Sequence, residues 1–305
     1  GPQATLSIDE SVHQNAQRYF EAARKQKDKT KGAVDALEDT MLQLQRAQKK
    51  EAKQQASGKL NKIKRSKRLW FEHHRWSMIT GGHLLVGGKD AKGNDSIVKK
   101  HLSGEDRYLH ADLHGAPSCS LRATQGFVVD EHKPAHIPED IPAFRIVDKL
   151  GDERITDEKL LEAASMALCW SRAWAGGGAH GTVYSVKPAQ VSKTAQTGEF
   201  VGKGSFIVRG QRQWFKDLDV QIGIGIVAIN GVPLLMGGRP ETIATTCQRY
   251  AILRPGLTKK EQLANRIYKN TGLVTDDVLP VLPGASDILE DYGIFSPPAS
   301  LAEEE

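Results

Sequence analysis

Two histidines and an aspartate alternate in the stretch "RYLHADLHGAPS" (Arg107 to Ser118). Successive side chains of an extended chain point to opposite faces, so His110, Asp112 and His114 would lie together on one face of a strand. Imidazole and carboxylate groups can bind a divalent metal ion, transfer protons, or form hydrogen bonds with the sugars and base edges of RNA. The stretch alone does not decide among these chemistries.

A metal site at these residues would need a fourth ligand or a water position, because same-face residues on a strand lie about 6.5 to 7 Å apart. The sequence has no other evident His/Cys cluster. In a structural role the histidines would end a strand and Gly115 would make the turn. In an RNA-binding role they would contact sugars and bases while nearby cations hold the phosphates. We predict one of these two roles, with no metal and no other cofactor.

The loop "GGKDAKGND" lies between a predicted strand and a predicted helix, where freed backbone N–H groups could accept a phosphate. No Ser or Thr follows Lys89, and GxGxxG is absent, so we reject a nucleotide hydrolase here. The loop could simply connect the two elements, with Asp90 or Asn94 capping the helix. Contact of Lys89, Lys99 and Lys100 with a phosphate backbone is the alternative.

Positive charge is concentrated in one segment, although the net charge of the 305 residues is only +5. Arg46 to Arg68 contains ten Lys or Arg and a single acid, Glu51, whereas Asn270 to Glu305 contains eight Asp or Glu and no Lys or Arg. A solvated helix followed by an unrelated acidic tail is one explanation. A polyanionic partner for the basic segment is the other.

The length allows one large or two ordinary domains with a full core. Cys119, Cys169 and Cys247 are too widely spaced for a disulfide framework or a zinc knuckle, which indicates a reducing, cytoplasmic setting. No apolar run approaches the ~20 residues that cross a bilayer. The opening Gly1-Pro2 is typical of a protease scar, so we expect a fragment of a longer protein.

The elements that would position these residues begin with a long helix. Ser7 to Glu10 fits a capping box, and helical periodicity continues to about Ala56. The 3-4-3 spacing of a coiled-coil seam is carried by Val34, Leu37, Met41 and Leu44. Because so polar a helix has only a narrow apolar seam, we expect it to pair with another helix.

Beyond residue 57 the pattern predicts strands joined by hairpins, with inserted helices. "RWSMITGGHLLVGG" predicts a hairpin and "NDSIVKKHL" a helix. Further helices are expected from Asp157 to about Ala175, over "ETIATTCQRY" and over "TKKEQLANRIYK", and Asn230-Gly231 predicts a type I′ turn. From Leu273 onward, prolines and acids predict an irregular, peripheral tail.

Two long segments together resemble the NFACT-R domain of the NFACT family of ribosome quality-control factors: "LLVGGKDAKGNDSIVKKHLSGEDRYLHADLHGAPSCSL" and "QVSKTAQTGEFVGKGSFIVRG". "SVHQNAQRYFEAARKQKDKTKGA" looks like the coiled-coil middle region of that family, and the tail with "NRIYKNTG" and "LPGASDILEDYG" looks like the archaeal form. The resemblance covers roughly Ser7 to Met236. Nothing here resembles the N-terminal NFACT-N domain.

The resemblance implies a cytoplasmic factor that binds large ribosomal subunits obstructed by peptidyl-tRNA and helps recruit tRNA for C-terminal tailing of the stalled chain. The implied partners are tRNA, ribosomal RNA and the large subunit, with no membrane. Family residues proposed to catalyse or to recruit charged tRNA lie largely in NFACT-N, so we expect this chain to bind and not to be an enzyme. His110, Asp112 and His114 match the family's "HADLHGA" signature, which we interpret as an RNA-facing or structural strand.

We therefore predict an α+β fold with four parts. These are a coiled coil (1–57), a basic linker (58–69), the NFACT-R domain (70–238) and a C-terminal helical extension with an acidic tail (239–305). The residues predicted to contact RNA are Lys62, Lys64, Arg65, Lys67, Arg68, Lys89, Asn94, Lys99, Lys100, His110, Asp112, His114, Lys193 and Arg209. Two alternatives remain, a metal-dependent hydrolase that acts on RNA through the His-Asp-His residues and a coiled-coil protein-interaction scaffold.

Overall fold

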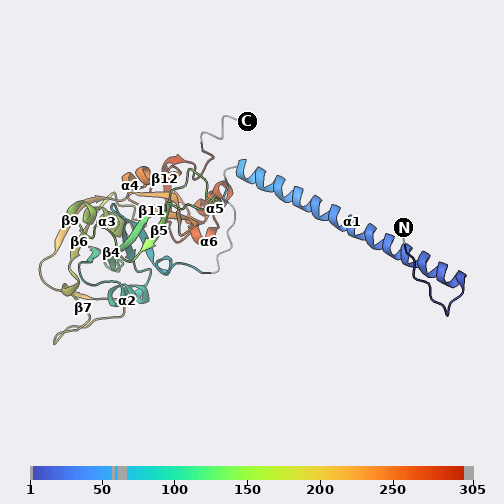
Figure 1. The fold of residues 1–305 in the computed structure, drawn as a ribbon. Coiled ribbons are helices and arrows are strands. Elements are labelled where there is room, and N and C mark those ends of the chain that lie inside the picture. The colour runs from blue at the N-terminus through green and yellow to red at the C-terminus, as the bar shows by residue number, and fades with distance from the viewer. Residues whose placement is uncertain (1–2, 57–58, 61–66, 299–305) are drawn as a thin grey trace. The chain divides into compact units, whose positions relative to one another are not determined.

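The structure is a computed structural model that describes residues 3–56, 59–60 and 67–298. It divides the chain into two compact units, residues 1–56 and 57–305 (Figure 1). The first unit is built on one helix, α1 (Val12–Ala56), as the sequence predicted. Among the described residues, no helix is long and apolar enough to cross a membrane.

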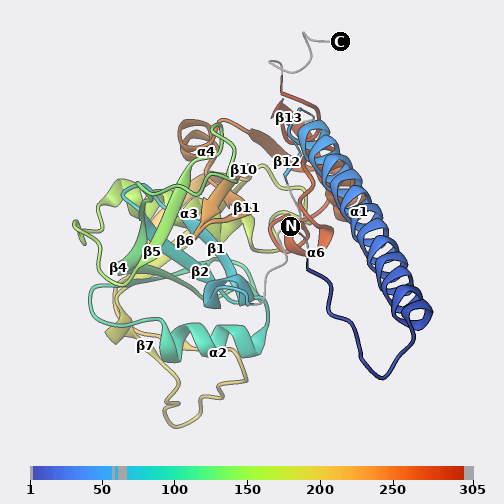
Figure 2. The same cartoon turned by 45° about the vertical axis from the view of Figure 1, so that its right-hand side comes forward.

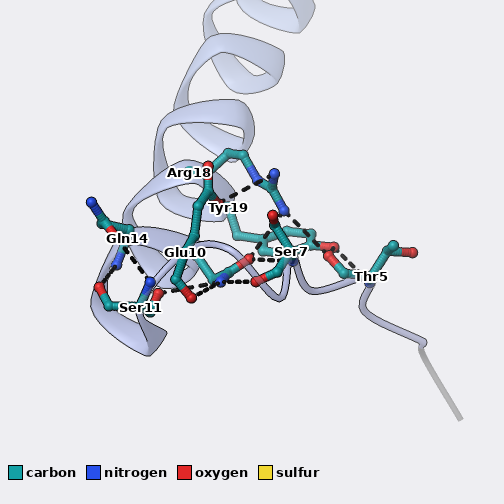
Figure 3. Close-up of polar contacts among 8 residues, drawn as sticks. Thr5, Ser7, Glu10, Ser11, Gln14, Arg18 and Tyr19 are labelled. Atoms are coloured by element: carbon teal, nitrogen blue, oxygen red, sulfur yellow. Dashed lines mark hydrogen bonds and ion pairs between the residues drawn. The ribbon is translucent and has the colours of Figure 1, made fainter.

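The start of α1 is held by a hook formed by the preceding residues (Figure 3). The Ser11 N–H donates to Gln14 Oε1 at 2.8 Å, and the Gln14 N–H donates to Ser11 Oγ at 3.3 Å, which is a capping box. The box predicted four residues earlier is wrong, because the Ser7 N–H instead donates to Asn15 Oδ1 at 2.8 Å. The Tyr19 hydroxyl bonds both backbone groups of Thr5 and closes the hook.

The predicted seam of α1 is exposed within its own unit. The exposed fractions are 49% for Val34, 64% for Leu37, 58% for Met41 and 55% for Leu44. Such a face gains stability only by burial against another surface. The helix is therefore confirmed, and its pairing in a coiled coil stays a prediction.

The second unit is a mixed α+β structure around a mostly antiparallel sheet of eleven strands. The strands are β1 (Arg75–Met78), β2 (His83–Gly87), β3 (Arg107–Ala111), β4 (Cys119–Val129), β5 (Ala143–Val147), β6 (His180–Val186), β9 (Gln213–Asp219), β10 (Ile222–Ile229), β11 (Val232–Gly238), β12 (Tyr250–Thr258) and β13 (Ser286–Tyr292). The main path runs β13-β12-β10-β5-β4-β3-β6-β9, with β2 also paired to β4 and β1, and β11 to β10. Among the strands of the described residues, only β5 and β10 pair in parallel.

Helices and a small second sheet complete this unit. The helices are α2 (Ala91–Lys100), α3 (Asp157–Cys169), α4 (Pro240–Thr246), α5 (Lys260–Thr271) and α6 (Thr275–Val278), with 3-10 turns at Trp70–His73 and Pro188–Gln190. The small sheet joins β7 (Val191–Ser192) to β8 (Ile207–Val208). Figure 2 places α2 and β7 at the end of the unit opposite α4.

In the second unit, a predicted hairpin, a predicted turn and one of two predicted helix caps are confirmed. β1 and β2 form the expected antiparallel hairpin. Asn230 and Gly231 both have positive φ, 49° and 77°, as the predicted type I′ turn between β10 and β11 requires. Asp90 is the residue that caps α2, since its Oδ1 accepts from the Gly93 N–H at 2.7 Å.

Two predicted helix ends are wrong. The helix predicted over "ETIATTCQRY" ends at Thr246, and Tyr250 already belongs to β12. α3 ends at Cys169 and does not reach Ala175. The Ser171 N–H and hydroxyl both donate to the Leu168 carbonyl oxygen, at 3.0 and 2.6 Å, and thereby replace the next helical hydrogen bond with a turn.

The prediction of an irregular, peripheral tail is also wrong. β13 is the edge strand of the main sheet, and Leu282, Ile294 and Phe295 are buried in the main core. The Trp174 indole N–H donates to the Ala285 carbonyl oxygen at 2.9 Å. The prolines interrupt the secondary structure, but the apolar residues between them still reach the core, which composition alone concealed.

This burial predicts the effect of truncating tail side chains. Leu282→Ala should lower the free energy of unfolding by about 2–5 kcal/mol, because it removes fully buried methyl groups from a packed core. Leu289→Ala, on β13 where the side chain is 40% exposed, should cost far less. Urea denaturation measures both variants. Equal, small losses would contradict the placement of the tail in the core.

A second stability effect follows from His101, whose ring stacks on Trp70 with 4.1 Å between centroids. Burial, reinforced by the charges of Arg122 and His74, lowers the pKa of His101 from 6.5 to about 4. Protonation therefore favours the unfolded chain, in which the pKa stays near 6.5. This contribution to stability is complete above about pH 6.5 and is lost as pH falls toward 4.

We expect the free energy of unfolding of His101→Gln to decrease less than that of the parent protein between pH 6.5 and 4. Urea denaturation at a series of pH values measures this difference. His132→Gln, in an exposed loop, serves as the control and should leave the profile unchanged. An unaltered profile for His101→Gln would show that this histidine is not a source of the acid sensitivity.

Candidate functional site

A hollow of about 500 Å³ lies beside the N-terminal end of α2 in the second unit. Strand β1, the end of β3, β6 and the loop at residues 203–206 all contribute to its wall. Cationic, imidazole and aromatic side chains in this wall include Arg75, Lys89, His110, His114, Tyr184 and Phe206. Cations and aromatic rings therefore face the same space.

The His-Asp-His motif does not lie on one strand face as predicted. β3 ends at Ala111, and Asp112 and His114 belong to the turn that follows, with Gly115 at a φ of 76°. The turn begins as the Leu113 N–H donates to the Ala111 carbonyl oxygen at 2.7 Å. Across the described residues, no three His, Cys, Asp or Glu side chains are grouped so that they could hold a metal ion.

His110 belongs instead to a row of rings that crosses three strands. It is the register partner of Tyr184 on β6, which is in turn the partner of Trp214 on β9. The ring centroids are 5.8 Å apart for the first pair and 5.5 Å for the second. The Arg212 guanidinium lies 4.5 Å from the centre of the Tyr184 ring. Trp214, at 43% exposure, is the accessible end of this aromatic row.

The two histidines of the motif occupy different environments. His110 is half-buried, and its burial lowers the pKa of the imidazole, although the backbone groups of Ala111 and Ala116 oppose that shift. The neutral ring is therefore the form present at neutral pH. His114 is exposed on the turn. His110 is thus placed to support the aromatic row, and His114 to meet a ligand.

A partly exposed ion pair between Lys193 and Asp95 attaches the loop after β7 to α2. Asp95 Oδ1 accepts from Lys193 Nζ at 2.7 Å and from the Gly204 N–H at 3.2 Å. The Lys193 hydrogen bond is the main reason that the pKa of Asp95 is lowered. Gly204 has a φ of 75°, and a Cβ there would lie 2.5 Å from Ala91 Cα, so only glycine fits this close approach. The loop's Lys203 and Phe206 are thereby held at the hollow.

The structure brings together four of the predicted RNA-contacting residues, because Lys89, Asn94, His110 and His114 all line the hollow. Asn94 also has a structural role, since its Oδ1 accepts from the Ser118 N–H at 3.0 Å. The exposed residues Lys99, Lys100 and Asp112 lie outside this lining.

The remaining predicted residues are dispersed. Lys193 is paired with Asp95, Arg209 with Glu199 at 2.8 Å, and Arg68 with Asp277 at 3.0 Å. Lys67 is exposed. Lys62, Lys64 and Arg65 lie outside the described residues. The RNA contacts predicted for all of these side chains stay predictions.

Sequence reasoning missed three residues of this region, Arg75, Lys203 and Trp214. Arg75 stands at the start of "RWSMITGGHLLVGG", where the pattern predicted only a strand of a hairpin. Trp214 had a usable pattern, because an aromatic residue two positions after Arg212 is the combination that stacks nucleic-acid bases. Lys203 lies in "QVSKTAQTGEFVGKGSFIVRG", whose composition did not indicate a role for this lysine.

Residues 67–210 match the family described as NFACT protein RNA binding domain. The chain is 31% identical over 244 residues to the archaeal Rqc2 homolog aRqcH of Methanocaldococcus jannaschii, covering 79% of this chain and 32% of that protein. It is 30% identical over 217 residues to the human ribosome quality control complex subunit NEMF, covering 71% of this chain and 18% of that protein. The chain thus spans a third or less of the length of these relatives.

Among solved structures, the C-terminal part of the fibronectin/fibrinogen-binding protein from Streptococcus suis aligns over 70% of this chain and 78% of that chain, with 19% identity and a TM-score of 0.33.

The contrast between the two histidines can be tested directly. His110→Gln should lower the Tm, with a loss of about 0.5–1.5 kcal/mol, because it removes a ring from the aromatic row. His114→Gln should leave the Tm unchanged, because the side chain is exposed. Thermal melts of the two single variants measure this difference. If His114→Gln lowered the Tm and His110→Gln did not, His114 would be the structural histidine and His110 the one available to a ligand.

Proposed function

The chain belongs to the NFACT family, and on this premise we propose that it is the RNA-binding part of a ribosome quality-control factor. Its NFACT-R domain is of a kind described as RNA-binding. The relatives from Methanocaldococcus, human and Schizosaccharomyces pombe are named as an Rqc2 homolog or as ribosome quality control complex subunits. A ribosomal role places the protein in the cytoplasm.

The observation that carries this proposal is the shared hollow, whose wall contains both cations and aromatic rings. Arg75, Lys89 and Lys203 supply positive charge, and Tyr184 leads to the exposed ring of Trp214. Phosphates bind to such cations, while unstacked bases bind to such rings. The combination favours RNA with unpaired nucleotides over a uniform duplex.

The proposed partners are tRNA, ribosomal RNA and the large ribosomal subunit. In this role the chain contacts large subunits obstructed by peptidyl-tRNA and helps to recruit tRNA for C-terminal tailing of the stalled chain. The names of the relatives support the ribosomal setting. The basic residues at the end of α1, among them Arg46, Lys49 and Lys50, add a second positively charged surface for a polyanion.

We propose binding and not catalysis for this part of the protein. Burial raises the thiol pKa to about 12 for each of Cys119, Cys169 and Cys247. A thiol with so high a pKa is protonated at neutral pH and is a poor nucleophile. The neutral, ring-packed His110 is likewise better suited to shaping a surface than to accepting protons.

A second role, protein interaction through α1, is favoured by its exposed seam. Leu37 at 64% exposure and Met41 at 58% would be buried by a partner helix with matching spacing. We propose that α1 forms half of a coiled coil. This role is compatible with RNA binding, because Arg46, Lys49 and Lys50 lie near the C-terminal end of α1, whereas the seam from Val34 to Leu44 lies closer to its N-terminal end.

The RNA-binding proposal predicts that Trp214→Ala weakens binding to a single-stranded RNA oligonucleotide by about 1–3 kcal/mol, the contribution of one stacked base. Its effect on a fully paired RNA duplex should be small, since paired bases are not available to stack. Fluorescence anisotropy at one fixed salt concentration measures both affinities.

Tyr292→Ala is the matched control, because Tyr292 is an aromatic residue with 52% exposure on β13, at the opposite edge of the sheet from β9. It should bind both RNAs as the parent protein does. Equal affinities for Trp214→Ala and Tyr292→Ala on single-stranded RNA would remove the stacking part of the proposal. A parent protein that binds neither RNA would refute the RNA-binding function itself.

A further inference from the structure

A groove of about 890 Å³ lies on the second unit, and it shares no wall residue with the hollow of the candidate site. Its wall comes from the turn between β1 and β2, the end of β4, the start of α3 and the helix α4. Apolar side chains in this wall include Met78 and Phe127, which are buried, Phe144, which is half-buried, and Val129, which is 66% exposed. A concave, largely apolar surface with a few polar groups is the usual form of a binding site.

The end of β4 turns a row of backbone groups toward this groove. The Asp130 N–H donates to the Ala143 carbonyl oxygen at 2.9 Å, on the side of β5. The Phe127 N–H donates to the Gly82 carbonyl oxygen at 2.7 Å, on the side of β2. Backbone groups alternate in direction along a strand, so the N–H and carbonyl groups of Val129 point to the side of β2 as well.

Strand β2 does not extend far enough to cover this edge. Its pairing with β4 starts at His83 and Gly126, and the chain before His83 turns away through the β1–β2 hairpin. Within the described part of the chain, no strand pairs with Val129 on that side. An open strand edge can accept an added strand, so the groove offers main-chain hydrogen bonds to an extended peptide.

A buried carboxylate in the same wall has no cation as its partner. Glu162 on α3 is 3% exposed and lines the groove. Its Oε2 accepts from the Thr80 N–H at 3.1 Å, and its Oε1 accepts from the Thr242 hydroxyl at 2.6 Å. Both donors are neutral, so these bonds hold the turn and α4 to α3 without neutralising the charge. Each carboxylate oxygen can accept a further hydrogen bond.

The two cations of the wall are engaged with other groups. Lys159 Nζ lies 2.9 Å from His83 Nε2 and donates to the Arg154 carbonyl oxygen at 2.7 Å. Arg239 is paired with Glu241 at 3.1 Å. The groove therefore combines apolar side chains with an acidic group that can still accept from a donor. The complementary ligand is apolar and carries a cation.

We propose that this groove binds an extended peptide segment of a partner protein, which pairs with the edge of β4 at Val129 and brings a lysine or arginine to Glu162. Side chains of an extended peptide alternate between two faces, so apolar residues beside the basic one cover Phe144 and its apolar neighbours. Apolar side chains and an acid do not suit a phosphate backbone, which binds to cations. This surface is separate from the hollow and does not depend on the RNA-binding function.

The first experiment selects ligands for the whole chain from a displayed library of random heptapeptides. We expect the enriched peptides to carry a lysine or arginine with apolar residues at alternate positions. Fluorescence anisotropy then measures the affinity of the best labelled peptide. Val129→Lys should weaken binding about tenfold or more, because the added ammonium group repels the basic side chain of the peptide. The side chain at this position is 66% exposed, so the fold should tolerate the substitution.

Leu257→Lys is the matched control, because Leu257 is an apolar residue with 92% exposure on β12 and lies outside the groove. It should bind the peptide as the parent protein does. Replacing the basic residue of the peptide with norleucine should weaken binding to the parent protein and have little effect on binding to Glu162→Gln, which isolates the contact between the two charges. If Glu162→Gln folds poorly in thermal melts, the comparison of Val129→Lys with Leu257→Lys decides the matter.

The second experiment tests the strand pairing by amide hydrogen exchange, followed by NMR. In the free chain the Val129 amide should exchange quickly, whereas the Asp130 amide is already bonded to Ala143. Saturating peptide should slow exchange at Val129 by about tenfold or more and leave Asp130 unchanged.

Four results would overturn the proposal. The first is a selection that enriches no peptide, or only peptides without a basic residue. The second is equal affinity of the peptide for Val129→Lys and Leu257→Lys. The third is a Val129 amide that the bound peptide leaves unprotected. The fourth is displacement of the peptide by a single-stranded RNA oligonucleotide that Val129→Lys binds more tightly than the parent protein does, since the groove would then belong to nucleic acid.

Discussion

The candidate site depends on one buried carboxylate, Asp106, at the start of β3. Its two oxygens accept from Arg122 Nε at 3.0 Å, from the Ala123 N–H at 2.8 Å and from the Ser103 N–H at 2.9 Å. These bonds join the chain before β3 to the middle of β4. A buried charge with a partner missing is strongly destabilising, so the three bonds fix the position of β3. The registers of β3 with β6 and of β6 with β9 then set where His110, Tyr184 and Trp214 lie.

The distribution of ion pairs separates cations that hold the structure from cations that remain available. Lys193 binds Asp95 and so attaches a glycine-rich loop to α2, and Arg209 binds Glu199 within that same loop region. Arg75 and Lys89, which line the hollow, have no carboxylate partner among the described residues. Lys193, which was predicted to contact RNA, thus holds the loop that lines the hollow, whereas the charge left for a ligand comes partly from Arg75, which the sequence did not single out.

The sequence predicted those features whose causes are local. The Asn230-Gly231 turn and the β1–β2 hairpin each depend on a few adjacent residues and were predicted correctly, and Asp90 was one of the two residues expected to cap α2. The capping box of α1 was predicted four residues too early, because the Ser7 N–H bonds Asn15 and the Ser11–Gln14 pair forms the box. Alternation also suggested a strand at Arg107–Ser118, but the strand stops at Ala111, where pairing with β6 gives way to a turn. No local pattern could reveal that Arg75 and Asp277 line the same crevice, because the fold brings them together from positions 202 residues apart.

That proximity is a consequence of how the sheet is completed. The family match ends at residue 210, yet the central strand β10 and its partners β11 and β12 all lie beyond it. The buried Ser77 hydroxyl on β1 donates to the Gly237 carbonyl oxygen on β11 at 2.7 Å, so the first hairpin of the domain is bonded to the later part of the chain. The Leu60 N–H donates to the Thr271 carbonyl oxygen at the end of α5, which anchors the entering chain on the same extension. The matched segment therefore does not close its own core, and the crevice beside Arg75 is also lined by Asp277, Pro280 and Val281 of the extension.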